Sequence, residues 1–188
     1  MARAVARRAD ILRAGAVLFA ARGFHGVSID ELGRAVGITG PAIYRHFPGK
    51  EALLAAMLLD ISERLAADGR RAVAESHSPD AALDALLRGH IAFALREPAL
   101  ITVQDRELDN VPEAERRSIR RLQRGYAEEW VAVLARLRPA QPTAALRAAV
   151  LATFGLLNST PHSAGGLSED AMADLLLAMG RAALLAED

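Results

Sequence analysis

Apolar residues recur at helical spacing along most of the chain, and short polar or Gly- and Pro-rich segments interrupt them. No stretch shows the apolar–polar alternation that is typical of half-buried strands. The pattern therefore predicts an all-α fold of about nine helices. Their expected ranges are residues 4–21, 28–37, 39–47, 50–74, 81–97, 98–107, 112–137, 143–159 and 168–185.

Residues 28–47 predict two short helices joined by a tight turn. Ser28 and Glu31 have the spacing of a capping box, which marks a helix start. Gly37 follows the apolar stripe of that helix and can adopt the left-handed conformation found just past helix ends. Thr39 is expected to cap the next helix, whose first turn contains a Pro, where a missing N–H costs nothing. Two helices with such a turn form a helix-turn-helix motif.

The second of these helices has an outward face that suits contact with DNA. Thr39, Tyr44, Arg45 and His46 lie within about two turns, and Lys50 follows at the start of the next helix. Hydroxyl and guanidinium groups are common partners of phosphates and base edges. Each of these residues taken alone could instead be an ordinary solvated side chain, but their joint spacing favours a DNA-binding element.

The segment GVSIDELGRAVGITGPAIYRHFPGKEALL resembles the N-terminal part of TetR-family transcription regulators, and the similarity runs from about residue 11 to residue 54. Its most specific part is the run 44–47 (Tyr-Arg-His-Phe) followed by Lys50 and Glu51. The chain departs from the family pattern at Gly33, where Ala is usual and where Gly should weaken the helix by up to about 1 kcal/mol. It also has Gly40 where many relatives carry a polar or basic side chain.

This resemblance implies a role for particular residues of the motif. Family members generally contact phosphates through the positions matching Thr39, Tyr44, His46 and Lys50, and face bases with those matching Gly40, Pro41 and Arg45. The expected DNA-binding set is Ser28, Thr39, Gly40, Pro41, Tyr44, Arg45, His46 and Lys50.

Charge is divided unevenly although the 188-residue chain has a net charge of zero. The first fifty residues contain eight Lys and Arg against three Asp and Glu, and the remainder carries the opposite excess. A basic segment of this kind favours phosphate, so binding to DNA should depend on salt. We therefore expect a DNA-binding domain over residues 1–49 and a helical ligand-binding and dimerisation domain over 50–188. Arg3, Arg7 and Arg8 could form a basic arm or a solvated, frayed helix end.

The side chains available for chemistry argue against an enzyme. The chain has no Cys, and its five His include no pair four residues apart, so neither a metal site, a cofactor nor a catalytic triad is indicated. No apolar run is long enough for a signal peptide or a membrane span. A soluble, cytoplasmic protein is expected.

The body of the chain carries a few polar or aromatic residues on otherwise apolar stripes, as a ligand pocket requires. For each one alone, a satisfied core position is the competing interpretation. An arginine stripe, Arg116, Arg120 and Arg124, could meet a phosphorylated or carboxylated ligand or could be a solvated face paired with Glu113. The candidate ligand-binding residues are His90, Phe93, Arg96, Gln104, Tyr126, Trp130, Phe154 and Asn158.

The last two helices are apolar on more than one face, which a monomer would leave exposed. Pairing with the same helices of a second copy would give a four-helix bundle, as TetR relatives usually form. The family resemblance then implies a homodimeric repressor on a palindromic double-stranded DNA operator, released by a small hydrophobic or amphipathic effector. Segments within residues 106–130 also resemble, loosely, relatives linked to fatty-acid or acyl-coenzyme A metabolism. The alternative is a helical small-molecule-binding or scaffold protein that does not bind an operator.

Overall fold

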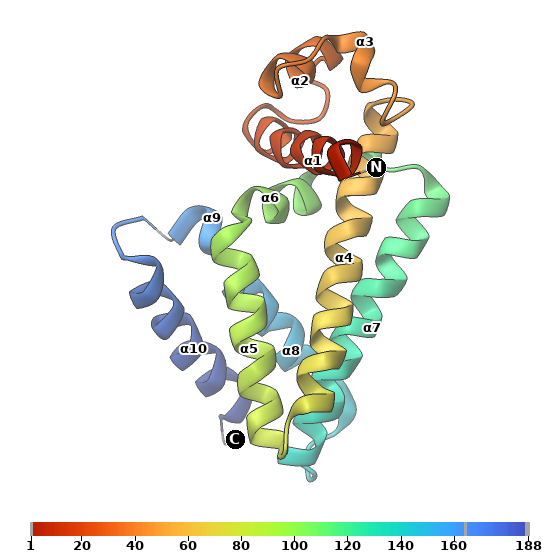
Figure 1. Ribbon diagram of the computed structural model, residues 1–188. Coiled ribbons are helices and arrows are strands. Elements are labelled where there is room, and N and C mark those ends of the chain that lie inside the picture. Colours follow the sequence, from red (N-terminus) through yellow and green to blue (C-terminus); the bar gives the residue numbers. More distant parts are fainter. Residues whose placement is uncertain (1, 164, 187–188) are drawn as a thin grey trace. The chain divides into compact units, whose positions relative to one another are not determined.

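The computed structural model of the chain describes residues 2–163 and 165–186, and these residues form helices and no strand, which confirms the all-α prediction (Figure 1). Most boundaries fall within two residues of those expected from the pattern. The elements in order are α1 (Ala2–Arg22), α2 (Ile29–Ala35), α3 (Gly40–Ile43), α4 (Lys50–Glu75), α5 (Pro79–Arg96), α6 (Pro98–Glu107), the 3-10 turn η1 (Leu108–Asn110), α7 (Glu113–Leu137), α8 (Thr143–Leu157), α9 (Thr160–Ser163) and α10 (Glu169–Leu185).

Two short elements differ from expectation. Helix α3 ends at Ile43 rather than near residue 47. The amides of Arg45 and His46 donate to carbonyl oxygens three residues earlier, as in a turn, and Pro48 cannot continue a helix. Helix α9 lies in a segment that was expected to be an irregular linker. It forms because the carbonyl oxygen of Ser159 accepts hydrogen bonds from two amides, and the hydroxyl of Thr160 donates to the carbonyl of Ala94 at 2.6 Å.

The chain divides into two compact units, each of which is described by itself. The first comprises residues 1–61 and 99–120, and the second comprises residues 62–98 and 121–188. Helices α4 and α7 therefore contribute to both units. This division reflects which residues pack together. The boundary expected between residues 49 and 50 separates a DNA-binding domain from a ligand-binding and dimerisation domain, and it stays a prediction.

The first unit is built around a small aromatic core. Phe19 and Phe24 lie with ring centroids 5.4 Å apart, and Ile43 and Phe47 are buried with them. Gly23 ends α1 with a φ of 73°, a conformation that Gly adopts without strain. Helices α1, α2 and α3 gather around the start of α4 (Figure 1).

The turn after α1 is held by two charged side chains from other parts of this unit. The amide of Phe24 donates to the carboxylate of Glu107 at 3.1 Å, and Glu107 also accepts from the side chain of Asn110 at 2.8 Å. The carbonyl of Phe24 accepts from the ammonium of Lys50 at 2.8 Å. Because Glu107 is buried, it would be costly to leave its charge without these donors.

The second unit has its own larger core. Helices α5, α8 and α10 pack against one another, and Gly180 of α10 allows a close approach because a Cβ there would lie 2.8 Å from Leu87. Leu83, Leu134 and Val150 are fully buried within the same cluster. This core supports the aromatic side chains that face it from α5, α7 and α8.

Candidate DNA-binding and ligand-binding sites

Helix α2 begins and ends with the predicted local interactions. The hydroxyl of Ser28 accepts from the amide of Glu31 at 3.2 Å, and the carboxylate of Glu31 accepts from the amide of Ser28 at 2.8 Å, which completes a capping box. This hydrogen bonding, with help from Arg22, lowers the pKa of Glu31. Gly37 has a φ of 69°, as expected for the residue after a helix end.

Gly33 has a role that its helix propensity does not suggest. A Cβ at this position would lie 2.8 Å from the carbonyl oxygen of Ile38 and 2.9 Å from the amide nitrogen of Gly40. Both atoms belong to the backbone, which cannot move aside as a flexible side chain could. The expectation that Ala would strengthen this helix is therefore wrong for this chain, since Gly33 lets the turn pack directly on α2.

The start of α3 also differs in detail from the prediction. Thr39 occupies the N-cap, but its side chain makes no capping hydrogen bond. Gly40 is buried, and a Cβ there would collide with the carboxylate of Asp30. The expected Pro in the first turn is present. Gly40 can therefore offer only backbone atoms to a partner.

The outward face around α3 remains open for contact. Thr39, Pro41 and Arg45 are exposed, Tyr44 has 56% of its surface exposed, and His46 is half-buried. An exposed aromatic side chain beside an arginine and a hydroxyl presents hydrogen-bond donors and an apolar ring on one short segment. This arrangement suits phosphates and base edges.

Lys50, the single lysine of the chain, is largely engaged inside the first unit. Its ammonium donates to the carbonyl oxygens of Phe24 and Val27 at 2.8 and 2.7 Å, and lies 4.6 Å from the centroid of the Phe24 ring. An ammonium has three N–H donors, so one is left for another partner. The structure gives Lys50 a folding role that the motif did not indicate, beside the predicted phosphate contact.

The N-terminal arginines with described side chains are also docked rather than extended as an arm. Arg7 donates to the carbonyl of Val36, at the end of α2, at 2.8 Å, and the guanidinium of Arg8 lies 4.9 Å from the centroid of the Phe47 ring. The side chain of Arg3 lies outside the described residues. Arg7 and Arg8 therefore support the helix-turn-helix from the side of α1.

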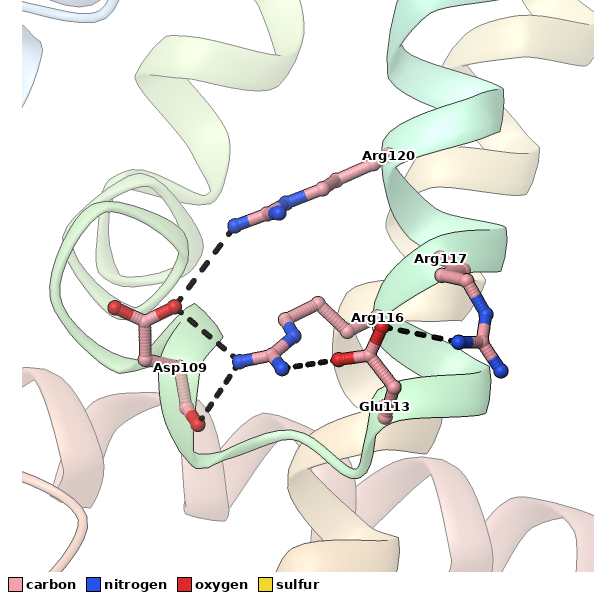
Figure 2. Close-up of polar contacts among 5 residues, drawn as sticks. All are labelled: Asp109, Glu113, Arg116, Arg117 and Arg120. Atoms are coloured by element: carbon pink, nitrogen blue, oxygen red, sulfur yellow. Dashed lines mark hydrogen bonds and ion pairs between the residues drawn. The ribbon is translucent and has the colours of Figure 1, made fainter.

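The arginines at the start of α7 are paired with carboxylates (Figure 2). Arg116 lies between Asp109 and Glu113 and bonds both, Arg117 contacts Glu113 at 3.1 Å, and Arg120 approaches Asp109 at 3.8 Å. The bond from Arg116 lowers the pKa of Glu113. These contacts favour the solvated, paired face over an anion-binding stripe, and they fix the corner between η1 and α7.

In the second unit, four aromatic side chains, His90, Tyr126, Trp130 and Phe154, pack into what we call the ring cluster. The rings of His90, Tyr126 and Phe154 are nearly parallel, with centroids 4.9 to 5.9 Å apart. Trp130 stands almost perpendicular to all three, at 5.1 to 6.0 Å. Phe93 lies edge-on to His90 at 5.8 Å. Parallel and perpendicular contacts at these distances are favourable for aromatic rings.

The imidazole of His90 is fully hydrogen-bonded within this cluster. Its Nε2 lies 3.0 Å from the side-chain oxygen of Asn158, and its Nδ1 lies 3.2 Å from the hydroxyl of Tyr126. Because the amide oxygen only accepts, Nε2 carries the proton and Nδ1 accepts from the hydroxyl. Burial lowers the pKa of His90 to about 4, against the opposing effect of the bond to Asn158, so the ring is neutral near pH 7.

The sequence-based ligand set is thus brought together only in part. His90, Phe93, Tyr126, Trp130, Phe154 and Asn158 are neighbours. Arg96 instead is exposed and pairs with Glu169 at 3.6 Å. Gln104 belongs to α6 in the first unit, so it is not placed in this cluster.

Two buried polar groups of the second unit have no hydrogen-bond partner among the described residues, and sequence reasoning singled out neither of them. They are the side-chain nitrogen of Gln123 and the hydroxyl of Thr153. The apolar stripe of α7 contained the signal for Gln123, which lies three residues before Tyr126 and seven before Trp130, on the same helix face.

The outer surfaces of α8 and α10 are apolar and exposed. Leu151 has 54% of its surface exposed, and Leu175 and Met179 are also exposed large apolar residues. Small residues surround them, including exposed Ala148 and Gly155. Apolar surface of this extent on neighbouring helices is typical of a protein interface.

Two further searches concern the part of the chain that the structure describes. No group of three or more His, Asp or Glu there could hold a metal ion. No helix there is both long and apolar enough to cross a lipid bilayer.

Comparison with known families decides the class of the protein. Residues 11–57 match the family described as bacterial regulatory proteins, tetR family, and residues 76–184 match the tetracyclin repressor-like C-terminal domain. The chain belongs to the TetR family. It is a transcriptional regulator and not an enzyme, and both the helix-turn-helix and the helical C-terminal domain expected from the motif are confirmed.

Individual relatives place this TetR-family regulator among diverse proteins. It is 28% identical over 129 residues to the HTH-type transcriptional repressor KstR2 of Rhodococcus jostii, a match that covers 68% of this chain and 63% of that protein's length. A TetR-family regulator from Bordetella parapertussis has a similar structure, with 26% identity, a TM-score of 0.81 and coverage of 92% and 93%. The fold also resembles that of FadR from Bacillus subtilis in complex with stearoyl-CoA, at 15% identity, a TM-score of 0.73 and coverage of 95% and 98%.

Proposed function

We propose that this TetR-family regulator is a homodimeric repressor that binds a palindromic operator and is released by a small hydrophobic or amphipathic molecule. The observation that carries the DNA-binding part is the open face of Thr39, Pro41, Tyr44 and Arg45 on a turn packed against a capped α2. This face lies in the basic first fifty residues, so its charge favours DNA over an acidic partner. Because its target is DNA, the protein is expected in the cytoplasm.

Within this face, the roles divide by chemistry. Arg45 is the exposed side chain able to donate two hydrogen bonds to a base edge, and Tyr44 offers one hydroxyl to a phosphate. Pro41 can add only apolar contact, and Gly40 only backbone. The predicted contacts of Ser28 and Lys50 compete with their hydrogen bonds inside the unit, so we expect them to add less.

The test is binding to labelled DNA from immediately upstream of the gene, followed by fluorescence anisotropy at two salt concentrations. Arg45→Ala and Tyr44→Phe should each weaken binding, and wild-type affinity should fall steeply with salt as counterions are released. Arg88→Ala is the matched control, since it removes an exposed arginine from α5 in the other unit. Equal, weak binding by all four proteins would favour the alternative, a helical small-molecule-binding or scaffold protein without an operator.

Dimerisation rests on the exposed apolar faces of α8 and α10. A second copy pairing through these helices would cover Leu151, Leu175 and Met179 and form a four-helix bundle. Leu151→Arg together with Leu175→Arg should give monomers in sedimentation experiments. Val17→Arg, which changes another exposed apolar residue in α1, should leave the dimer intact. Wild-type protein that sediments as a monomer at high concentration would contradict this part of the proposal.

The effector is proposed to bind in the second unit near the ring cluster. Support comes from the apolar surroundings with a few polar groups, which is the composition of ligand sites. An acyl-coenzyme A is one candidate, because a structurally similar regulator was crystallised with stearoyl-CoA. A ligand can release the operator only by as much as it prefers the state that does not bind DNA.

A further inference from the structure

The carboxylate of Asp30 occupies the place that a side chain at position 40 would take. Asp30 lies in the first turn of α2, and Gly40 begins α3, which packs against α2. A Cβ at Gly40 would collide with Oδ1 of Asp30 and would lie 3.0 Å from its carboxyl carbon. Thr39 and Pro41, on either side of Gly40, are exposed on the face proposed to meet DNA, and Asp30 is exposed as well. At this point of the face, α2 rather than α3 therefore supplies the polar group.

This carboxylate has no structural task, unlike the other acidic side chains of the basic segment. The first fifty residues contain three acids. Asp10 pairs with Arg13 on α1, and Glu31 completes the capping box of α2. For Asp30, the guanidinium of Arg34 donates to the backbone carbonyl at 3.4 Å and not to the side chain. Nothing among the residues that the structure describes pairs with the Asp30 carboxylate, so it is free to meet a partner.

The chemistry of a carboxylate limits which base edge it can meet. An ionised carboxylate accepts hydrogen bonds and donates none. In the major groove, guanine presents two acceptors and thymine presents an acceptor and a methyl group, so both would repel it or leave it unpaired. Adenine has an amino group, but its N7 acceptor lies beside it. Cytosine presents its N4 amino group without an acceptor next to it on the same base, so cytosine is the base that suits a carboxylate.

The negative charge has opposite effects on affinity and on specificity. It repels the phosphates of every DNA sequence, and a hydrogen bond offsets this repulsion only where an amino group lies opposite the carboxylate. A group of this kind increases the difference between the matching site and other sites, more than it increases binding. General attraction to DNA comes instead from the eight Lys and Arg of the first fifty residues.

We propose that Asp30 is a specificity-determining residue that accepts a hydrogen bond from the N4 amino group of a cytosine in the major groove of the operator. This inference rests on the proposed operator binding and adds an α2 residue to the DNA-contacting set. Asp30 complements Arg45, whose exposed guanidinium suits the two acceptors of guanine. Each half of a palindromic operator should then contain one cytosine that is selected by Asp30.

The first test is selection of binding sites from a randomised double-stranded DNA library by the full-length protein. Wild-type protein should enrich half-sites in which one position is cytosine. Asp30→Asn should change that position to adenine, which an amide contacts through both of its polar atoms, and should leave the other positions as they are. Asp10→Asn is the matched control, because it removes one carboxylate from α1 of the same unit. It should leave every position unchanged.

The second test measures the hydrogen bond on defined DNA by fluorescence anisotropy. The selected operator is compared with a copy in which thymine replaces that cytosine in both half-sites. Wild-type affinity should fall about ten-fold, as for one mismatched base pair. For Asp30→Ala, which keeps the capping box but has no side-chain acceptor at this position, the two DNAs should differ by less than about two-fold. Thermal unfolding of both variants verifies that they are folded.

Two results would overturn the inference. One is an Asp30→Asn protein that selects the same base as the wild type at every position. The other is an Asp30→Ala protein that binds all DNA more tightly but still prefers cytosine to thymine as strongly as the wild type, because the carboxylate would then only repel phosphates. Either result leaves operator binding intact. Wild-type protein that enriches no sequence would instead refute operator binding and, with it, the role of Asp30.

Discussion

The DNA-binding face and the ring cluster treat their polar side chains in opposite ways. Around α3, Tyr44 and Arg45 are exposed and available to a charged partner. In the ring cluster, His90 is buried and neutral, with both nitrogens bonded to residues 36 and 68 positions away in the sequence. The first surface suits a polyanion and the second an uncharged molecule, so the two sites of one regulator should respond differently to charge, pH and substitution.

The largest difference should appear on acidification. His90 has a folded-state pKa of about 4 against an ordinary value of 6.5, so the unfolded chain binds more protons between these values. Stability is therefore unaffected above about pH 6.5 and falls as the pH drops toward 4, by about 3 kcal/mol in all. Urea unfolding from pH 7 to 4 should show this loss in the wild type and much less of it in His90→Gln. Parallel pH profiles for the two proteins would mean that His90 is not held neutral by burial.

A comparably large effect should follow from Gly33→Ala in the DNA-binding unit. The new Cβ would press on two backbone atoms of the turn at 2.8 and 2.9 Å, and the expected cost is about 2 to 3 kcal/mol. Operator binding should be lost with it, because the turn and α3 must shift. Gly89→Ala is the control, since nothing lies near a Cβ there and a helical Ala should stabilise by up to about 1 kcal/mol. A Gly33→Ala protein with improved stability would instead support the expectation that Ala strengthens this helix through its higher helix propensity.

These two regions also differ in how far the sequence predicted them. The helix-turn-helix depends on neighbours in the chain: Ser28 with Glu31 three residues later, and Gly37 at the helix end. Such local pairs are visible as spacing, so the fold class and the motif could be predicted. The sequence did not predict contacts between residues far apart in the chain, such as those of Lys50 with the carbonyl of Val27 and of Glu107 with the amide of Phe24.

For the ring cluster, the sequence could predict which residues face inward but not which of them meet. Its members come from α5, α7 and α8, and helical periodicity shows which residues face inward but not which inward faces meet. Arg96 was therefore grouped with His90 although it lies exposed beside Glu169. Gln123 was missed although it lies on the apolar stripe of α7. Its position in the sequence shows that it faces the core but not whether a hydrogen-bond partner lies near its side chain.

Within the DNA-binding unit, the variant Lys50→Met tests whether Lys50 contributes mainly to stability or mainly to DNA binding. The variant loses two charge-assisted hydrogen bonds to backbone carbonyls, so the free energy of unfolding should fall by about 2 kcal/mol. Tyr44→Phe should leave stability unchanged and weaken only operator binding, because Tyr44 is exposed. Thermal unfolding and anisotropy on the same samples distinguish the two. If Lys50→Met unfolds like the wild type but binds DNA weakly, its main partner is phosphate.

The smallest expected effects concern two glycines that flank the ring cluster in different ways. Gly69 of α4 lies under Tyr126, and a Cβ there would meet the ring edge at 2.7 Å, whereas a Cβ at Gly125 of α7 would meet nothing within 4 Å. Gly69→Ala should therefore destabilise by about 1.5 kcal/mol, because the tyrosine must give up its place beside His90. Gly125→Ala should stabilise by up to about 1 kcal/mol through helix propensity alone. The two variants together measure how tightly the ring cluster is packed. If Gly69→Ala also stabilised the protein in urea unfolding, Tyr126 could move without a cost in free energy. The cluster would then be loose enough to accept ligands that make no matching hydrogen bond.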